Sequence, residues 1–135
     1  MQIEASLQNL DEVVEYLEQT LPSDAIVFLR GDLASGKTTL TKAIAKYKGI
    51  DSEVTSPTFS LQHCYGDGLY HYDLYRLSHD EFMSMGLYEE FAKSGWHLVE
   101  WGSDELKEFL QNVGFSPFVI EITPKKNSRV YRIEE

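Results

Sequence analysis

Residues 31–38 read GDLASGKT, and they follow directly on the apolar run AIVFLR at 25–30. The stretch matches the pattern G-x-x-x-x-G-K-[ST], in which two glycines let the backbone curl so that successive N–H groups point into one concave nest. The next residues, KTTLTKAIAKY at 37–47, predict a helix that Gly49 closes. A strand, a glycine-rich turn and a helix in this order indicate a phosphate-binding loop, or P-loop, at a helix N-terminus.

Two side chains of the loop have specific chemical tasks. Lys37 would bring a mobile positive charge to the β- and γ-phosphates of a nucleotide, and Thr38 would offer its hydroxyl to Mg²⁺, which prefers hard oxygen ligands. The alternative is an ordinary strand-to-helix turn with a solvent-facing lysine, and the flanking strand and helix disfavour it. The predicted nucleotide-binding residues are Gly31, Asp32, Leu33, Ala34, Ser35, Gly36, Lys37, Thr38 and Thr39.

A P-loop also needs an acidic partner on a neighbouring strand to complete the metal shell. Two carboxylates qualify, since Asp73 ends the run LYHYD at 69–73 and Glu100 ends the run WHLVE at 96–100. Spacing alone leaves open which of the two binds the metal. In a strand His71 shares a face with Asp73, and that face would be able to point toward the phosphates. A hydrogen-bonded core or surface histidine is nevertheless the favoured interpretation of His71.

The remaining pattern predicts an α/β fold in one domain, residues 1–135. Apolar residues recur at helical spacing from Leu7 to Leu21, with Ser6 as a cap, and Ser78 with Glu81 has the spacing of a capping box. The last two strands are expected to form an edge hairpin. Further strands are predicted at 58–65, 69–74, 96–101, 118–123 and 129–133, and a further helix at 103–112.

Composition narrows the class of function. Twenty-two acidic residues against twelve basic ones give a net charge of −10, which disfavours an extended basic groove for DNA or structured RNA. No apolar run is long enough to cross a bilayer, and the N-terminus lacks a secretory pattern, so we expect a cytoplasmic protein without a membrane partner. The single cysteine, Cys64, fits a reducing compartment.

Four ordered motifs, GDLASGKTTL (31–40), SPTF (56–59), HYDLYRL (71–77) and VEW (99–101), resemble the TsaE (YjeE) family over nearly the whole chain. That family consists of bacterial ATPases that assist formation of N6-threonylcarbamoyladenosine beside the tRNA anticodon. The resemblance implies a P-loop NTPase-like three-layer sandwich, with a mixed, mostly parallel sheet and helices on both faces. It also implies ATP and Mg²⁺ as ligands and a TsaB–TsaD heterodimer as partner, with tRNA contacted only through that complex.

The resemblance assigns roles to individual residues. Thr38 and Glu100 are the metal-side residues, and Arg129 matches an arginine near the nucleotide. Lys37, Asp73 and Glu100 are the catalytic candidates, because Lys37 would spread the developing charge and Asp73 would position the attacking water. Slow, partner-dependent ATP hydrolysis is expected. Two switch-like segments are implied, the first with Ser56, Pro57 and Thr58 and the second with His71, Asp73 and Arg76.

The loop departs from the family at one place, since the family usually reads GDLGAGKTT and Ala34-Ser35 stand here in the middle. If the family glycine at position 34 has a positive φ, alanine there would cost about 1 kcal/mol, a tolerable amount that would weaken affinity or slow hydrolysis while the backbone nest, Lys37 and Thr38 remain. Two other functions stay open. A nucleotide-dependent binding module with little turnover would need Lys37, but neither Asp73 nor Glu100, for complex formation. A small-molecule P-loop kinase ranks last, because only four arginines are present and a phosphate-acceptor lid normally needs them.

Overall fold

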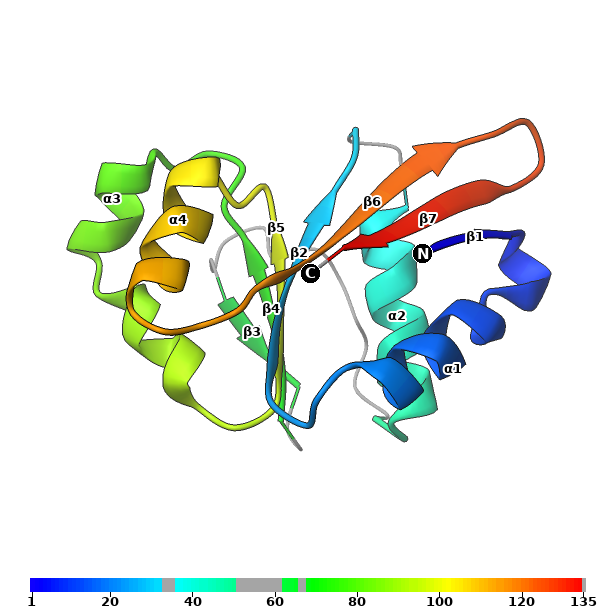
Figure 1. Ribbon diagram of the computed structural model, residues 1–135, viewed down its shortest axis with the longest axis horizontal. Coiled ribbons are helices and arrows are strands. Elements are labelled where there is room, and N and C mark those ends of the chain that lie inside the picture. Colours follow the sequence, from blue (N-terminus) through cyan, green and yellow to red (C-terminus); the bar gives the residue numbers. More distant parts are fainter. Residues whose placement is uncertain (33–35, 51–61, 66–67, 135) are drawn as a thin grey trace.

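A seven-stranded mixed sheet forms the centre of the molecule in the computed structural model, which describes residues 1–32, 36–50, 62–65 and 68–134 (Figure 1). The four central strands are parallel, and the outer pairs are antiparallel. The predicted mixed sheet is confirmed, although three of the six strand pairs in the described residues, rather than most of them, are parallel. The strands run in the order β1 (Gln2–Ala5), β7 (Arg129–Glu134), β6 (Phe118–Pro124), β2 (Ala25–Arg30), β5 (Trp96–Glu100), β4 (Leu69–Asp73) and β3 (Gln62–Cys64).

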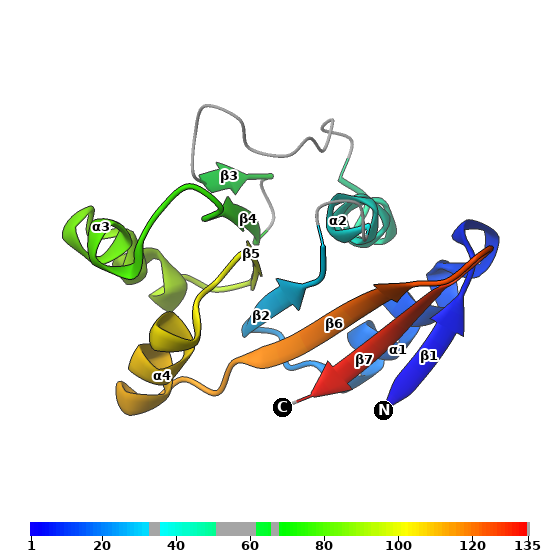
Figure 2. The same ribbon diagram turned by 90° about the horizontal axis from the view of Figure 1, so that it is seen from above.

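Helices cover both faces of this sheet, as predicted (Figures 1 and 2). On one face lie α1 (Asp11–Thr20) and α2 (Lys37–Tyr47), and on the other lie α3 (His79–Ser84), the 3₁₀ helix η2 (Leu87–Ala92) and α4 (Asp104–Asn112). Within the described part of the chain, no helix combines the length and apolar character that spanning a membrane would require.

The alternation of side chains along the central strands divides the core in two. Val27 and Leu29 of β2 pack into the core beneath α1 and α2, whereas Ile26 and Phe28 pack into the core beneath α3 and α4. Every residue of β5 is buried. These two strands read as continuous apolar runs because both of their faces are covered, and each fully buried aliphatic or aromatic side chain stabilises the fold by roughly 1.5–3 kcal/mol.

The two chain ends differ from the prediction. The first helical stretch begins as a separate 3₁₀ helix, η1 (Leu7–Asn9), which Ser6 precedes as N-cap, and α1 begins only at Asp11. Strand β1 was not predicted, because Ala5 is its only buried side chain and no alternation marks it. The predicted hairpin of β6 and β7 is confirmed by their antiparallel pairing, but its predicted edge position is wrong, since β1 pairs with β7 and takes the edge of the sheet.

The strands predicted at 58–65 and 69–74 are represented by β3 and β4, which pair antiparallel, Gln62 with Tyr72 and His63 with His71. Residues 51–61 and 66–67 lie outside the described residues. The predicted first switch-like segment, Ser56, Pro57 and Thr58, and the start of the strand predicted at 58–65 therefore stay predictions.

Candidate functional site

The predicted P-loop lies between the carboxyl end of β2 and the start of α2, with Gly31 and Asp32 on one side and Gly36 on the other. Leu33, Ala34 and Ser35 lie outside the described residues. Gly36 is the N-cap of α2 and has φ of 102°, a left-handed conformation that glycine adopts without strain.

Arg129, the first residue of β7, packs directly against Gly36. A Cβ atom added to Gly36 would lie 2.7 Å from Cζ of Arg129, so the guanidinium occupies the space that any larger residue would need. The sequence resemblance implied an arginine near the nucleotide at this position, and the structure places its side chain against the P-loop.

Lys37 is buried, with 3% of its surface exposed, so the alternative of a solvent-facing lysine is wrong. Its Nζ donates a hydrogen bond to the Gly31 carbonyl at 2.7 Å and lies 3.7 Å from the centre of the Trp101 ring. Burial lowers the pKa of Lys37 from its ordinary value, while Glu100 and, more weakly, Asp73 oppose this effect. An anion bound beside this ammonium would offset the cost of its burial.

Trp101 lies at the candidate site, although the sequence pattern did not predict any contact for it. It follows the last residue of β5 with φ of 62°, the only positive φ among the non-glycine residues that the structure describes. This conformation costs about 1–2 kcal/mol for a residue with a side chain. The turn places the indole over Lys37 and against the ring of Tyr75, with 4.8 Å between ring centres. The one available signal was the position of a tryptophan directly after a strand-ending carboxylate.

The two candidate carboxylates lie side by side at the same edge of the sheet. Glu100 is the register partner of Asp73 on one side and of Leu29 on the other, so the carboxyl ends of β4, β5 and β2 meet at the P-loop. Ligands of open α/β sheets bind at this edge.

The surroundings distinguish these carboxylates. Glu100 is buried, and its Oε2 accepts a hydrogen bond from Thr38 Oγ1 at 3.5 Å. Asp73 is half-buried, and its Oδ1 accepts a hydrogen bond from the backbone N–H of Tyr75 at 3.0 Å. Glu100 therefore faces the residue predicted to bind the metal, while Asp73 holds the turn that follows β4.

His71 is completely buried, and its Nε2 is hydrogen-bonded to Oε2 of Glu100. The interpretation as a hydrogen-bonded core histidine is confirmed, and its partner turns out to be the buried candidate carboxylate. His71 lies on the α1–α2 face of the sheet, beside the ring of Tyr65. Arg76, the remaining residue of the second switch-like segment, is exposed.

Thr38 and Glu100 are suited to hold a divalent cation together with phosphate oxygens. Among the residues that the structure describes, no group of three or more His, Cys, Asp or Glu side chains is arranged to hold a metal ion. Mg²⁺ in nucleotide sites is usually bound by one or two protein oxygens plus phosphates and water, and the hydroxyl and carboxylate present here fit that donor set.

Two cavities lie at the carboxyl ends of strands of the sheet. One of about 370 Å³ lies at the ends of β2 and β5 and is lined by Arg30, Lys37, Trp101 and Asp104 among others. The second, about 200 Å³, lies at the carboxyl end of β6, where Pro124 and Arg129 meet the segment 5–7. The first cavity borders Lys37 directly, and the second borders Arg129, whose side chain packs against Gly36.

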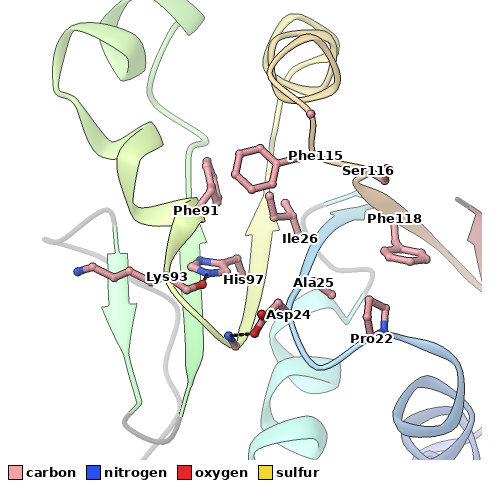
Figure 3. Close-up of a pocket in the computed structure, with 12 residues that line it drawn as sticks. Pro22, Asp24, Ala25, Ile26, Phe91, Lys93, His97, Phe115, Ser116 and Phe118 are labelled. Atoms are coloured by element: carbon pink, nitrogen blue, oxygen red, sulfur yellow. Dashed lines mark hydrogen bonds between the residues drawn. The ribbon is translucent and has the colours of Figure 1, made fainter.

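A third cavity of about 250 Å³ lies at the opposite, amino end of the central strands (Figure 3). Ile26, Phe91, Phe115 and Phe118 supply most of its apolar lining. His97 also borders this cavity. Its Nε2–H donates a hydrogen bond to the Lys93 carbonyl at 2.8 Å. Because the proton of the neutral ring is on Nε2, Nδ1 accepts a hydrogen bond from the Tyr72 hydroxyl at 2.6 Å. Burial lowers the pKa of His97.

Comparison with known proteins gives one family and several relatives. The family described as threonylcarbamoyl adenosine biosynthesis protein TsaE matches residues 4–132. Three curated relatives carry the name tRNA threonylcarbamoyladenosine biosynthesis protein TsaE. The relative from Treponema pallidum is 41% identical over 95 residues, 66% of this chain and 70% of that protein. The relative from Rickettsia conorii is 37% identical over 122 residues, 87% and 66% of the two chains.

The relative from Bacillus subtilis is 48% identical over 83 residues, which cover 59% of this chain and 51% of that protein. This chain thus spans about half the length of that relative. Among solved structures, the crystal structure of YdiB from Bacillus subtilis is similar, with a TM-score of 0.66 and 27% identity. The match covers 97% of this chain and 83% of that chain.

Proposed function

The chain belongs to the TsaE family, whose members take part in tRNA threonylcarbamoyladenosine biosynthesis, and from this premise we propose that it is a Mg²⁺-dependent ATP-binding protein and slow ATPase. It acts in the cytoplasm as one P-loop ATPase domain that assists a TsaB–TsaD heterodimer in modifying tRNA beside the anticodon. The observation that carries the proposal is the buried ammonium of Lys37, which lies at the N-terminus of α2 near the carboxylates of Glu100 and Asp73.

Nucleotide phosphates bind at the N-terminus of α2. The unpaired N–H groups there and the charge of Lys37 attract anions locally, in spite of the net charge of −10. The ammonium of Lys37 contacts the Gly31 carbonyl and the Trp101 ring, and bound phosphates would replace these contacts. The base lies on the β6 side, in the cavity between Arg129 and the segment 5–7, because the metal-side carboxylates lie on the opposite side of the loop.

Thr38 and Glu100 hold the metal, since their oxygen atoms already lie 3.5 Å apart. When bound, Mg²⁺ supplies positive charge that neutralises the β- and γ-phosphate oxygens. Asp73 is half-buried at the neighbouring strand end and orients the attacking water. The water oxygen forms a bond to the γ-phosphorus as the bond to ADP breaks, and the water proton leaves with the phosphate. Lys37 stabilises the charge that develops on the phosphate oxygens.

Calorimetry with Mg·ATP and Mg·GTP tests nucleotide binding. We expect ATP to bind, and Lys37→Met to weaken it by about 100- to 1,000-fold, or about 2.7–4 kcal/mol, because a charge-assisted contact to phosphate is lost. Lys48→Met is a matched control, since Lys48 lies at the other end of α2 with its ammonium 3.9 Å from the Trp96 ring centre. Equal losses in the two variants would contradict a phosphate site at Lys37.

Phosphate release, measured with and without TsaB–TsaD, tests the enzymatic part. We expect slow release from the chain alone and faster release in the complex, whereas equal rates would defeat partner dependence. Complex formation that survives Asp73→Ala without any turnover would favour the binding module, and transfer of phosphate to an acceptor would favour the kinase.

A further inference from the structure

Glu100 and His71 form a buried pair at the edge of the candidate site. Both side chains are almost fully enclosed, with 4% and 0% of their surfaces exposed. A carboxylate accepts hydrogen bonds, so Nε2 of His71 carries the proton and donates it to Oε2 of Glu100. The tautomer of His71 is therefore the one protonated at Nε2.

The pairing follows from the strand register. Asp73 lies opposite Glu100 on adjacent parallel strands, and His71 lies two residues earlier on the same face of β4 as Asp73. The other polar contact described for the Glu100 carboxylate is the long one from Thr38, at 3.5 Å. A carboxylate with only that contact could rotate about its terminal torsion, whereas the imidazole fixes one of its oxygen atoms.

Packing alone does not explain an imidazole at this position. Nδ1 of His71 is buried and has no hydrogen-bond partner among the residues that the structure describes. An apolar side chain of similar size would fill this position without burying two ring nitrogens. The imidazole differs from such a side chain in that one N–H is hydrogen-bonded to Glu100.

We propose that His71 is a positioning residue: it holds Glu100 in the orientation in which this carboxylate and Thr38 together receive the divalent cation. The inference rests on the proposed function and deepens it. In this role His71 touches neither nucleotide nor metal and acts only through Glu100. Partners that orient metal-binding side chains typically change metal affinity by about 10- to 100-fold when they are removed.

Three variants test the role by calorimetric titration of ADP, with Mg²⁺ and with EDTA. His71→Leu removes the donor, and His71→Gln places an amide N–H near the position of Nε2. His97→Leu is the matched control, because His97 is equally buried on the neighbouring strand but lies against Phe91 on the opposite face of the sheet. We expect His71→Leu to reduce the gain in ADP affinity from Mg²⁺ by about 10- to 100-fold and to leave the affinity in EDTA unchanged.

His71→Gln should restore most of the gain from Mg²⁺, and His97→Leu should keep all of it. A full gain in His71→Leu would overturn the inference while leaving the proposed function intact. An equal loss of affinity in EDTA and in Mg²⁺ would show a merely structural role and would also overturn it. Absence of any gain from Mg²⁺ in the unmodified protein would refute the proposed function itself.

NMR of the unmodified protein gives a test that needs no variant. We expect the imidazole of His71 to carry its proton on Nε2, and the signal of this proton to shift when Mg²⁺ is added to the ADP-bound protein. The corresponding proton of His97 should not shift. A His71 ring protonated only on Nδ1 would overturn the assignment.

Discussion

The two ends of the central parallel strands carry different kinds of side chain. At the carboxyl ends Lys37, His71 and Glu100 are buried although all three are polar or charged. At the amino ends the cavity is lined mainly by apolar residues such as Phe91 and Phe118, as Figure 3 shows. One set of strands therefore has two different ends: buried charges at one end reduce stability, as expected if the proposed nucleotide site lies there, while the apolar end stabilises the fold.

The two buried histidines show the same contrast within two neighbouring strands. His97 is bonded to uncharged groups through both ring nitrogens, the Tyr72 hydroxyl and the Lys93 carbonyl. His71 is bonded to the carboxylate of Glu100. Substitutions test this contrast. Those at the carboxyl end should change ligand binding, whereas those at the amino end should change only stability.

After Lys37→Met, the largest effect is expected for Glu100→Gln. Loss of the negative charge should reduce the Mg²⁺-dependent gain in ADP affinity by about 100-fold, or about 2.7 kcal/mol. The free energy of unfolding should stay the same or rise, because a buried carboxylate no longer has to be desolvated. Calorimetry and urea denaturation measure the two quantities. Glu108→Gln, at an exposed position on α4, is the control, and the contrast fails if Glu100→Gln unfolds more easily yet keeps its response to Mg²⁺.

A smaller effect, on stability and not on ligand binding, is expected for Phe91→Leu at the amino end. Phe91 is 3% exposed, and its ring centre lies 4.9 Å from that of Tyr72 and 5.6 Å from that of His97. The smaller side chain should lower the free energy of unfolding by about 1–2 kcal/mol through lost contacts. Urea denaturation measures this loss, and ADP affinity should change by less than about twofold. A large change in ADP affinity would mean that the two ends are coupled.

The smallest effect concerns the pH dependence of stability. Burial lowers the pKa of His97 below its ordinary value of 6.5 in the folded protein. Below pH 6.5 the unfolded chain therefore takes up a proton that the folded chain resists, and the free energy of unfolding falls as the pH falls, by at most about 1.4 kcal/mol per pH unit. The loss ends once the pH is below the folded pKa.

Urea denaturation between pH 7.5 and pH 5.5 measures this slope. His97→Gln should flatten the slope relative to the unmodified protein, because glutamine does not titrate. Identical slopes in the two proteins would show that His97 does not contribute to the pH dependence.

The local parts of the site could be predicted from the sequence. Strand β2 at 25–30 and helix α2 at 37–47 have the bounds that the pattern indicates, because a continuous apolar run and a glycine-rich turn act within a few residues. Asp73 and Glu100 were identified as carboxylates that end apolar strands, and the structure makes them register partners. Their unequal burial depends on neighbouring strands and could not be predicted.

Contacts between segments that are distant in the sequence could not be predicted from the sequence pattern. The indole of Trp101 reaches Lys37 only because the backbone of Trp101 has a left-handed conformation. A tryptophan at this position does not predict that conformation. Strand β1 owes its place to pairing with β7, since its own four residues bury little. The sequence resemblance implied that Arg129 lies near the nucleotide, but its contact with Gly36 needs the whole sheet.

The packing of Arg129 against Gly36 has a consequence for biosynthesis. The two residues are 93 positions apart, so at about 5–20 residues per second the ribosome needs roughly 5–20 s to reach the arginine after it has added the glycine. During that interval the nascent chain has the lysine and the turn but lacks the guanidinium and the strand that carries it. The contact between Arg129 and the glycine turn therefore forms only after β7 has been synthesised, well after the turn itself.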